Sequence, residues 1–262
     1  MTRVAVVTGA ARGIGAATLL ALGSAGWAVV AVDRCEDDPR LPYRLGTAEQ
    51  LAAVVATAGD SGRVVPLVAD ACSSSAMAEA VELAERRFGG LDAMIAVAGV
   101  IAGGVPLWQM PVTEQDAVLE GNLASVLVAA RTGIPALLRR PPPRAGRFVA
   151  VTSAAATRGL PMLAAYCAAK GGATALVRAL AAELRGTDVT ANCVTPGSTA
   201  TPILDESARL YDLESAEAFS AQQPIERLIR PDEVAATIRW LVDASTAAVT
   251  GAAIPVDGGL SL

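Results

Sequence analysis

The chain has 262 residues, of which 53% are hydrophobic and only 3% aromatic, and its formal net charge is -5. This length suits a single α/β domain over residues 1–262, with a core of mainly small aliphatic side chains. The negative charge argues against nucleic acid or an anionic membrane as a partner. The absence of histidine excludes a Ser-His-Asp triad and most zinc sites.

The four cysteines are scattered without a CxxC spacing, so we predict reduced thiols and no metal site. The uncharged stretch 93–113 has nearly the length of a membrane span, but its glycines, prolines and Gln109 favour a strand followed by a loop. No signal peptide is recognisable at the start of the sequence. We therefore expect a cytoplasmic protein.

Apolar runs of strand length alternate with helical patterns along the chain, which is typical of βαβ units. Strands are predicted over residues 4–8, 28–33, 64–70, 93–96, 148–152, 189–194 and 253–256. Helices are predicted over residues 13–25, 48–58, 75–88, 113–139, 163–184 and 232–243. The pattern predicts a Rossmann-like, doubly wound, parallel seven-stranded sheet with helices on both faces. Two segments, 34–46 and 201–230, are too long for plain connections, and loops of this size usually have a function.

The sequence TGAARGIG follows the first predicted strand, at residues 8–15. Gly9, Gly13 and Gly15 permit a tight turn and a close approach of the backbone to a pyrophosphate, and the following helix directs its free N–H groups toward the phosphates. The alternative is a glycine-rich turn without a ligand. The position between a strand and a helix favours a dinucleotide site.

An acidic residue, Asp33, ends the second predicted strand, 18 residues beyond Gly15. A carboxylate there receives the ribose hydroxyls of NAD and repels the 2′-phosphate of NADP, so we predict NAD. Arg34 and Arg12 are the counter-evidence, because a guanidinium group nearby could accommodate NADP. Asp70, after the third strand, either accepts from the adenine amino group or is a solvated carboxylate.

Tyr166 and Lys170 lie four residues apart in a predicted helix, hence on one face. A phenol with a pKa near 10 is a poor base at neutral pH, and a neighbouring ammonium could lower that pKa. Ser153 follows the fifth strand, at the edge where open α/β sheets bind ligands. Asn122 lies within the long fourth helical pattern, where it either serves the site or bonds its own helix backbone.

Several motifs together resemble the classical short-chain dehydrogenase/reductases over nearly the whole chain. TGAARGIG matches TGxxxGIG, YCAAK (166–170) matches YxxxK, PGSTAT (196–201) matches PGxxxT, and VDGG (256–259) matches the motif of the last strand. The resemblance implies catalytic roles for four residues: Tyr166 as acid/base, Lys170 lowering its pKa and binding the nicotinamide ribose, Ser153 orienting the reacting oxygen, and Asn122 holding a water of a proton relay. The predicted cofactor-binding residues are Gly9, Arg12, Gly13, Ile14, Gly15, Asp33, Arg34, Asp70, Ala71, Ala98, Gly99, Tyr166, Lys170, Pro196, Gly197, Thr199 and Thr201.

Two departures from the family pattern stand out. AVAG (96–99) replaces the usual NNAG, so the packing beside the cofactor must differ, and RCEDDPRLPYRLGT (34–47) is inserted after the second strand. This insertion and the Ala-rich frame resemble the mycofactocin-coupled subgroup. That resemblance implies an NAD that does not exchange freely and electron transfer to mycofactocin. The carboxyl-terminal strand and VDGG resemble the subunit interface of the whole family, which implies a homotetramer.

These observations predict an NAD-dependent dehydrogenase that transfers a hydride between a secondary alcohol or ketone and a tightly held nicotinamide. The segment 201–230 is expected to cover the substrate, with apolar contacts from Leu204, Leu210, Tyr211, Leu213 and Phe219, or to be a mobile cover without selectivity. The alternatives are an NADPH-dependent 3-ketoacyl reductase, which Asp33 disfavours, and an NAD-binding protein without catalysis.

Overall fold

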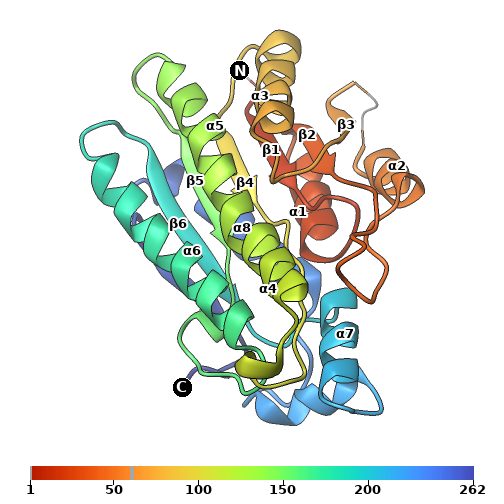
Figure 1. The fold of residues 1–262 in the computed structure, drawn as a ribbon. Coiled ribbons are helices and arrows are strands. Elements are labelled where there is room, and N and C mark those ends of the chain that lie inside the picture. Colours follow the sequence, from red (N-terminus) through yellow and green to blue (C-terminus); the bar gives the residue numbers. More distant parts are fainter. Residues whose placement is uncertain (1, 60–61) are drawn as a thin grey trace.

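The computed structural model describes residues 2–59 and 62–262, and these form a seven-stranded sheet whose paired strands are all parallel (Figure 1). The strands are β1 (Val4–Thr8), β2 (Ala28–Asp33), β3 (Val64–Val68), β4 (Ala93–Ala96), β5 (Arg147–Val151), β6 (Thr190–Pro196) and β7 (Ala253–Val256). Their order is β3-β2-β1-β4-β5-β6-β7. The chain changes direction across the sheet between β1 and β4, and the carboxyl ends of strands at such a switch point form the usual ligand crevice.

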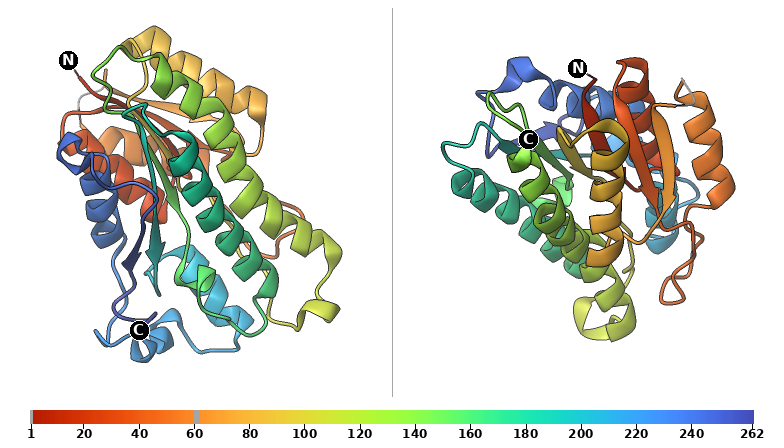
Figure 2. Two further views of the ribbon diagram at one scale, coloured as in Figure 1. Left: turned by 90° about the vertical axis from the view of Figure 1, so that its left-hand side faces the viewer. Right: turned by 90° about the horizontal axis from the view of Figure 1, so that it is seen from above.

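Helices cover both faces of the sheet (Figure 2) because side chains alternate along each strand. Val4 and Val6 of β1 belong to one core cluster, and Ala5 and Val7 belong to the other. The first cluster lies under α3 (Ser74–Phe88), α5 (Ser125–Arg139) and α6 (Ala164–Glu183), and the second lies under α1 (Gly13–Ser24), α2 (Ala48–Thr57) and α8 (Pro231–Leu241). The predicted fold class is confirmed.

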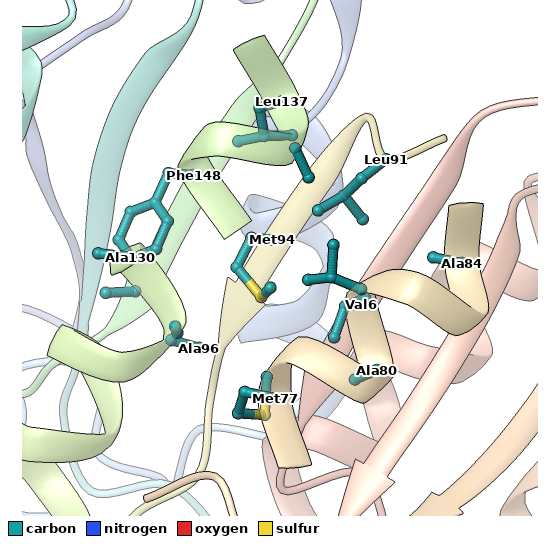
Figure 3. Packing of buried hydrophobic residues seen from close by; sticks show 14 of the residues in the cluster. Val6, Met77, Ala80, Ala84, Leu91, Met94, Ala96, Ala130, Leu137 and Phe148 are labelled. Atoms are coloured by element: carbon teal, nitrogen blue, oxygen red, sulfur yellow. The ribbon is translucent and has the colours of Figure 1, made fainter. Parts of the chain in front are cut away.

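Small side chains let the helices approach the sheet closely. Met94 of β4 lies between Met77 of α3 and Phe148 of β5 in the first cluster (Figure 3). A Cβ on Gly133 of α5 would lie 2.7 Å from the Met94 Cε atom, so the side chain of Met94 fills the space that this glycine leaves open. The alanine-rich composition therefore corresponds to tight packing of helices on the sheet.

Local signals explain where several helices begin and end. Thr47 and Gln50 form a capping box at the start of α2, and the Ser73 hydroxyl accepts from Ala76 N at the start of α3. α3 ends at Gly89, whose φ of 84° lies in the left-handed region that glycine favours. The strand boundaries are corrected in three places: β3 ends at Val68 rather than at residue 70, β5 begins at Arg147, and β6 runs from Thr190 to Pro196.

The helix predicted over 113–139 is three segments. α4 (Val112–Leu119) and α5 are separated by a π-helical turn, Glu120–Ala124, that contains Asn122. By length and composition, the helical stretch Val112–Arg139 could cross a membrane. It is instead a core helix, because Val126 and Leu137 of α5 are buried against the sheet.

Two long segments cover the carboxyl edge of the sheet. Residues 34–46 form no helix or strand, as predicted, whereas 201–230 contains a helix, α7 (Pro202–Leu210), and a 3₁₀ helix, Ala216–Gln222, that the sequence patterns did not indicate. Further short 3₁₀ turns are Leu107–Gln109, Ala154–Ala156 and Ala244–Thr246.

Candidate active site

A cavity of about 670 Å³ lies at the carboxyl edge of the sheet, with walls from the first glycine turn to α7. It collects every predicted catalytic and cofactor-binding residue except Asn122. The lining includes Gly9, Arg12, Gly13, Ile14, Gly15, Asp33, Arg34, Asp70, Ala71, Ala98, Gly99, Ser153, Tyr166, Lys170, Pro196, Gly197, Thr199 and Thr201. Residues that are far apart in the chain therefore meet in one place.

The glycine turn leaves no room for side chains. A Cβ on Gly15 would lie 1.9 Å from the Gly9 carbonyl oxygen, and a Cβ on Gly9 would lie 2.9 Å from the Ala98 Cα atom. Gly9 also has a φ of 67°, which L side chains rarely adopt. Arg12 precedes α1 and makes no side-chain cap, so the first N–H groups of the helix remain available to an anion. This turn fits the pyrophosphate of a dinucleotide.

The Thr8 hydroxyl stabilises the loop that departs from the family pattern. Its oxygen accepts hydrogen bonds from Val97 N at 3.0 Å and Ala98 N at 3.1 Å. The side chain at the end of β1 thereby holds the AVAG segment after β4 beside the glycine turn. Because the AVAG segment uses only backbone N–H groups for this link, the link forms without the asparagines of the usual NNAG pattern.

The carboxylate of Asp33, the last residue of β2, lies in the wall of the cavity. Its two oxygens accept from Ala11 N at 3.0 Å and Cys35 N at 3.1 Å, which fixes its orientation. The guanidinium of Arg34 is 3.3 Å from Asp38, and that of Arg12 donates to the Arg44 carbonyl at 2.9 Å. Of the two arginines that could have received a 2′-phosphate, Arg34 is thus paired with a carboxylate, whereas Arg12 is bonded only to a backbone carbonyl.

Asp70 lies in the cavity wall beyond the end of β3. One carboxylate oxygen accepts from Cys72 N at 2.8 Å. That bond orients the carboxylate locally, and both interpretations of its role remain predictions.

Tyr166 and Lys170 lie one turn apart near the start of α6, and Ser153 follows β5. The Lys170 Nζ atom is 5.7 Å from the centre of the Tyr166 ring and donates to the Val151 carbonyl at 3.0 Å. The Ser153 hydroxyl accepts from Ala155 N at 3.1 Å and lines the same cavity as Tyr166. The three side chains therefore meet as the spacing predicts.

The pKa of the phenol differs from the expectation. Burial raises the pKa of Tyr166 to about 12, and the hydrogen bond with Ser153 acts in the opposite direction. Burial also lowers the pKa of Lys170 to about 8. The prediction that Lys170 makes this phenol acidic is wrong for the protein alone, because removal from water disfavours both charged forms.

Asn122 lies beneath the cavity, fully buried in the π-helical turn. Its Nδ2 donates to the carbonyls of Val118 at 2.8 Å and Val100 at 2.7 Å, and its Oδ1 accepts from Val100 N at 3.3 Å. The alternative of a bond to its own helix is partly correct, since Val118 is four residues earlier. The side chain mainly fixes the loop after β4, and the expected water relay stays a prediction.

Asn122 and Lys170 approach each other at Gly99. A Cβ on Gly99 would lie 2.8 Å from the Asn122 Oδ1 and 3.4 Å from the Lys170 Nζ. Only glycine therefore fits between the two polar side chains without displacing one of them.

The insertion reaches further into the site than its position in the sequence indicates. Leu41 and Leu45 are buried in a cluster that also contains Tyr166, and Leu45 lines the cavity. The Tyr43 hydroxyl oxygen accepts from Ile101 N at 2.9 Å. Arg40 forms an ion pair of 2.7 Å with Glu120 in the π-helical turn. The sequence patterns singled out none of these contacts.

The segment 201–230 forms the other wall. Four of the five predicted apolar residues line the cavity: Leu204, Tyr211, Leu213 and Phe219. Leu210 is not in the lining; its carbonyl oxygen would lie 3.0 Å from a Cβ on Gly104. Tyr211 packs edge-on to Phe219 at 6.1 Å and donates to the Pro161 carbonyl at 2.7 Å, so this wall is anchored to the loop before α6.

The PGSTAT segment is shaped by a residue that sequence analysis missed. Gln223 is buried and binds both Ser198 N at 2.9 Å and Ser198 O at 3.3 Å. The Thr199 hydroxyl donates to the Gly197 carbonyl, and the Thr201 hydroxyl donates to the Thr199 carbonyl, each at 3.1 Å. A polar side chain after an apolar 3₁₀ turn was the only available signal for Gln223.

Comparisons with known proteins agree with this geometry. Residues 9–261 match the family model described as Enoyl-(Acyl carrier protein) reductase. The chain is 35% identical to a cis-4-hydroxycyclohexanecarboxylate dehydrogenase of Sinomonas cyclohexanicum, covering 98% of this chain and 96% of that protein. It is 30% identical to a 3-oxoacyl-[acyl-carrier-protein] reductase of Synechocystis, with 98% and 96% covered. The crystal structure of a carveol dehydrogenase from Mycobacterium avium in complex with NAD superimposes with a TM-score of 0.91 at 28% identity, covering 98% and 97% of the two chains.

Proposed function

Because this chain belongs to the classical short-chain dehydrogenase/reductase family, we propose that it is an NAD-dependent dehydrogenase for hydrophobic secondary alcohols and the corresponding ketones. The observation that carries the proposal is that Ser153, Tyr166 and Lys170 line the same cavity as the glycine turn. A dinucleotide on that turn and a substrate beside Tyr166 can occupy this cavity together.

Proton transfer is the task of the side chains. The substrate hydroxyl would hydrogen-bond Ser153 and Tyr166, and its proton would pass to the Tyr166 Oη atom as the carbonyl forms. A nicotinamide held by the glycine turn would supply the hydride acceptor for this oxidation. Positive charge near the phenol favours the phenolate, and Lys170, with a pKa of about 8, can supply it when protonated. Ketone reduction reverses each transfer.

Asp33 supports NAD as the cofactor. Its carboxylate is oriented by two backbone N–H groups and lies where a ribose would be received, while Arg34 and Arg12 are engaged with Asp38 and Arg44. A 2′-phosphate brought to this place would meet the Asp33 carboxylate, and the guanidinium of Arg34 is already paired with Asp38. The similarity to a 3-oxoacyl reductase supports the NADPH-dependent ketoacyl reductase as the second candidate.

The substrate proposed is a cyclic secondary alcohol. The wall formed by Leu204, Leu213 and Phe219 offers apolar contact to a compact ring. Two similar proteins are, by name, dehydrogenases of cyclic alcohols.

We expect purified protein to oxidise substituted cyclohexanols with NAD, or with an artificial dye where bound NAD must be reoxidised. The measurement is product formation by mass spectrometry across a panel of alcohols, with NADP in a parallel series. Faster turnover with NADP, or with NADPH and a 3-ketoacyl thioester, would favour the second candidate. Binding of NAD without turnover of any alcohol or ketone would favour a non-catalytic protein.

The insertion supports a tightly held cofactor and, as part of the resemblance, mycofactocin as electron acceptor. Leu45 and Gly46 line the cavity beside Asp33, while Leu41, Tyr43 and Arg40 attach the segment to the loop after β4 and to the π-helical turn. Cofactor release would require these contacts to open. Electron transfer to mycofactocin is tested by adding that compound to enzyme reduced by its alcohol and recording oxidation of the bound NADH.

We expect the protein to retain its nicotinamide through purification. The double variant Leu41→Ser/Leu45→Ser should lose the nicotinamide at least about tenfold faster, because two buried apolar side chains are removed. Release is measured by mass spectrometry of the nucleotide that remains after dialysis. Arg44→Ala changes an exposed side chain of the same insertion and serves as the matched control. Equal retention by both variants, or free exchange in the parent protein, would contradict this function of the insertion.

A homotetramer and a cytoplasmic location complete the proposal. β7 is the edge strand of the sheet and pairs only with β6 among the described residues, so its outer edge is available to another subunit. Light scattering tests the assembly.

A further inference from the structure

We propose that Arg158 recognises a carboxylate on the substrate, remote from the carbon that reacts. The inference deepens the function proposed above and rests on it: the preferred substrate is a hydrophobic ring that carries both a secondary hydroxyl and a carboxylate. The substrate class is thus a cyclic hydroxy acid and its keto acid.

The charged residues of the cavity wall fall into two groups. Arg12, Asp33, Arg34 and Asp70 come from the glycine turn and the ends of β2 and β3, where the adenosine half of a dinucleotide would lie. Lys170 lies beside Tyr166. Arg158 is the remaining charged residue of the wall, and it belongs to the substrate side, between the turn after Ser153 and α6.

Several apolar side chains share the cavity wall with Arg158, which is itself exposed to solvent. The lining there includes Leu160, Pro161, Leu163, Leu213, Phe219 and Leu260. A lone cation in such a wall favours a ligand with an apolar body and one negative group, and it disfavours a cationic substrate.

The backbone of Arg158 is held at a defined place relative to the catalytic residues. Its N–H donates to the Ala154 carbonyl at 3.0 Å, and its carbonyl accepts from the Cys167 Sγ at 3.7 Å. Ala154 follows Ser153, and Cys167 follows Tyr166. A substrate that contacts Ser153 and Tyr166 at one end can therefore extend toward Arg158 at the other.

The guanidinium of Arg158 still has N–H groups that can bind a ligand. Its Nη1 donates to the Leu260 carbonyl, and no carboxylate of the described residues lies within 4.0 Å of it. An arginine has five N–H donors in a planar fork, so the edge formed by Nε and Nη2 remains for a two-point contact. Such an edge matches a carboxylate in shape and charge.

The experiment compares 4-hydroxycyclohexanecarboxylate with its methyl ester, which has nearly the same shape without the charge. We expect the parent protein to prefer the acid. Arg158→Gln should raise KM for the acid by about 10- to 100-fold, the usual effect of losing a charge-assisted contact. KM for the ester should change less than about twofold. Arg158→Lys should recover part of the preference. Arg185→Gln removes the same charge from an exposed place outside the cavity and should leave the preference unchanged.

Several outcomes would overturn the inference. Preference for the ester in the parent protein, or an equal effect of Arg158→Gln on acid and ester, would mean that Arg158 only anchors the chain end at Leu260. Turnover of neither alcohol would contradict the proposed function instead. In that case, binding of cyclohexanecarboxylate is measured by thermal shift: stabilisation of the parent protein that Arg158→Gln abolishes supports the carboxylate site, and equal stabilisation of both proteins refutes it.

Discussion

Replacing Tyr166 by phenylalanine is expected to lower kcat for alcohol oxidation by about 100- to 10,000-fold, the usual contribution of a positioned acid/base. The ring keeps its partly buried position and only the hydroxyl is lost. NAD affinity should change little, because the glycine turn and Asp33 are untouched. Steady-state kinetics and calorimetric titration with NAD measure the two quantities separately.

The matched control removes a hydroxyl from another tyrosine of the same cavity. Tyr211→Phe loses one hydrogen bond, to the Pro161 carbonyl, and should change kcat by less than about tenfold. Undiminished activity of the Tyr166 variant would remove Tyr166 from the mechanism.

The pH profile provides a second check on Tyr166. Oxidation requires Tyr166 as the phenolate, which accepts the proton of the substrate hydroxyl. Because burial raises the pKa of Tyr166 to about 12, the phenolate fraction at lower pH increases about tenfold with each added pH unit. Below about pH 8, where Lys170 keeps its charge, oxidation by the parent protein should therefore accelerate with rising pH at saturating cofactor, whereas ketone reduction, which uses the protonated phenol, should not. The residual activity of Tyr166→Phe should lack this acceleration. A parent profile without any rise would show that another group accepts the proton.

The second large effect is expected at the glycine turn. Gly15→Ala places a Cβ only 1.9 Å from the Gly9 carbonyl oxygen. Two non-bonded atoms cannot lie that close, so the turn must open. Overpacking of this kind costs about 1–3 kcal/mol, and the displaced turn should bind NAD at least about 100-fold more weakly. Thermal unfolding and calorimetric titration measure the two effects.

Gly171→Ala is the matched control within the same domain. A Cβ there would lie 3.7 Å from the nearest atom outside its own helix, an ordinary contact, and alanine favours helix. This variant should keep NAD affinity and stability. Normal NAD binding by Gly15→Ala would show that the turn does not receive the pyrophosphate.

Local patterns in the sequence were sufficient for the fold and for most of the site. Alternating apolar residues place Val6 and Val7 on opposite faces of one strand, and the four-residue spacing places Tyr166 and Lys170 on one helix face. Such relations depend only on the repeat of a strand or a helix. Because parallel strands end at one edge, the same patterns also indicated that Gly15, Asp33 and Ser153 would share a cavity.

The amino-acid sequence by itself thus determined the sheet, the glycine turn and the pairing of Tyr166 with Lys170 on one helix face, because spacing along the chain defines each of them. Only the tertiary structure decided the contacts between distant segments: Tyr43 with Ile101, Gln223 with Ser198, and Arg158 with Leu260. It also decided the direction of the Tyr166 pKa, which depends on how far the surrounding chain removes the phenol from water. Neither long-range packing nor burial is encoded in the spacing of neighbouring residues.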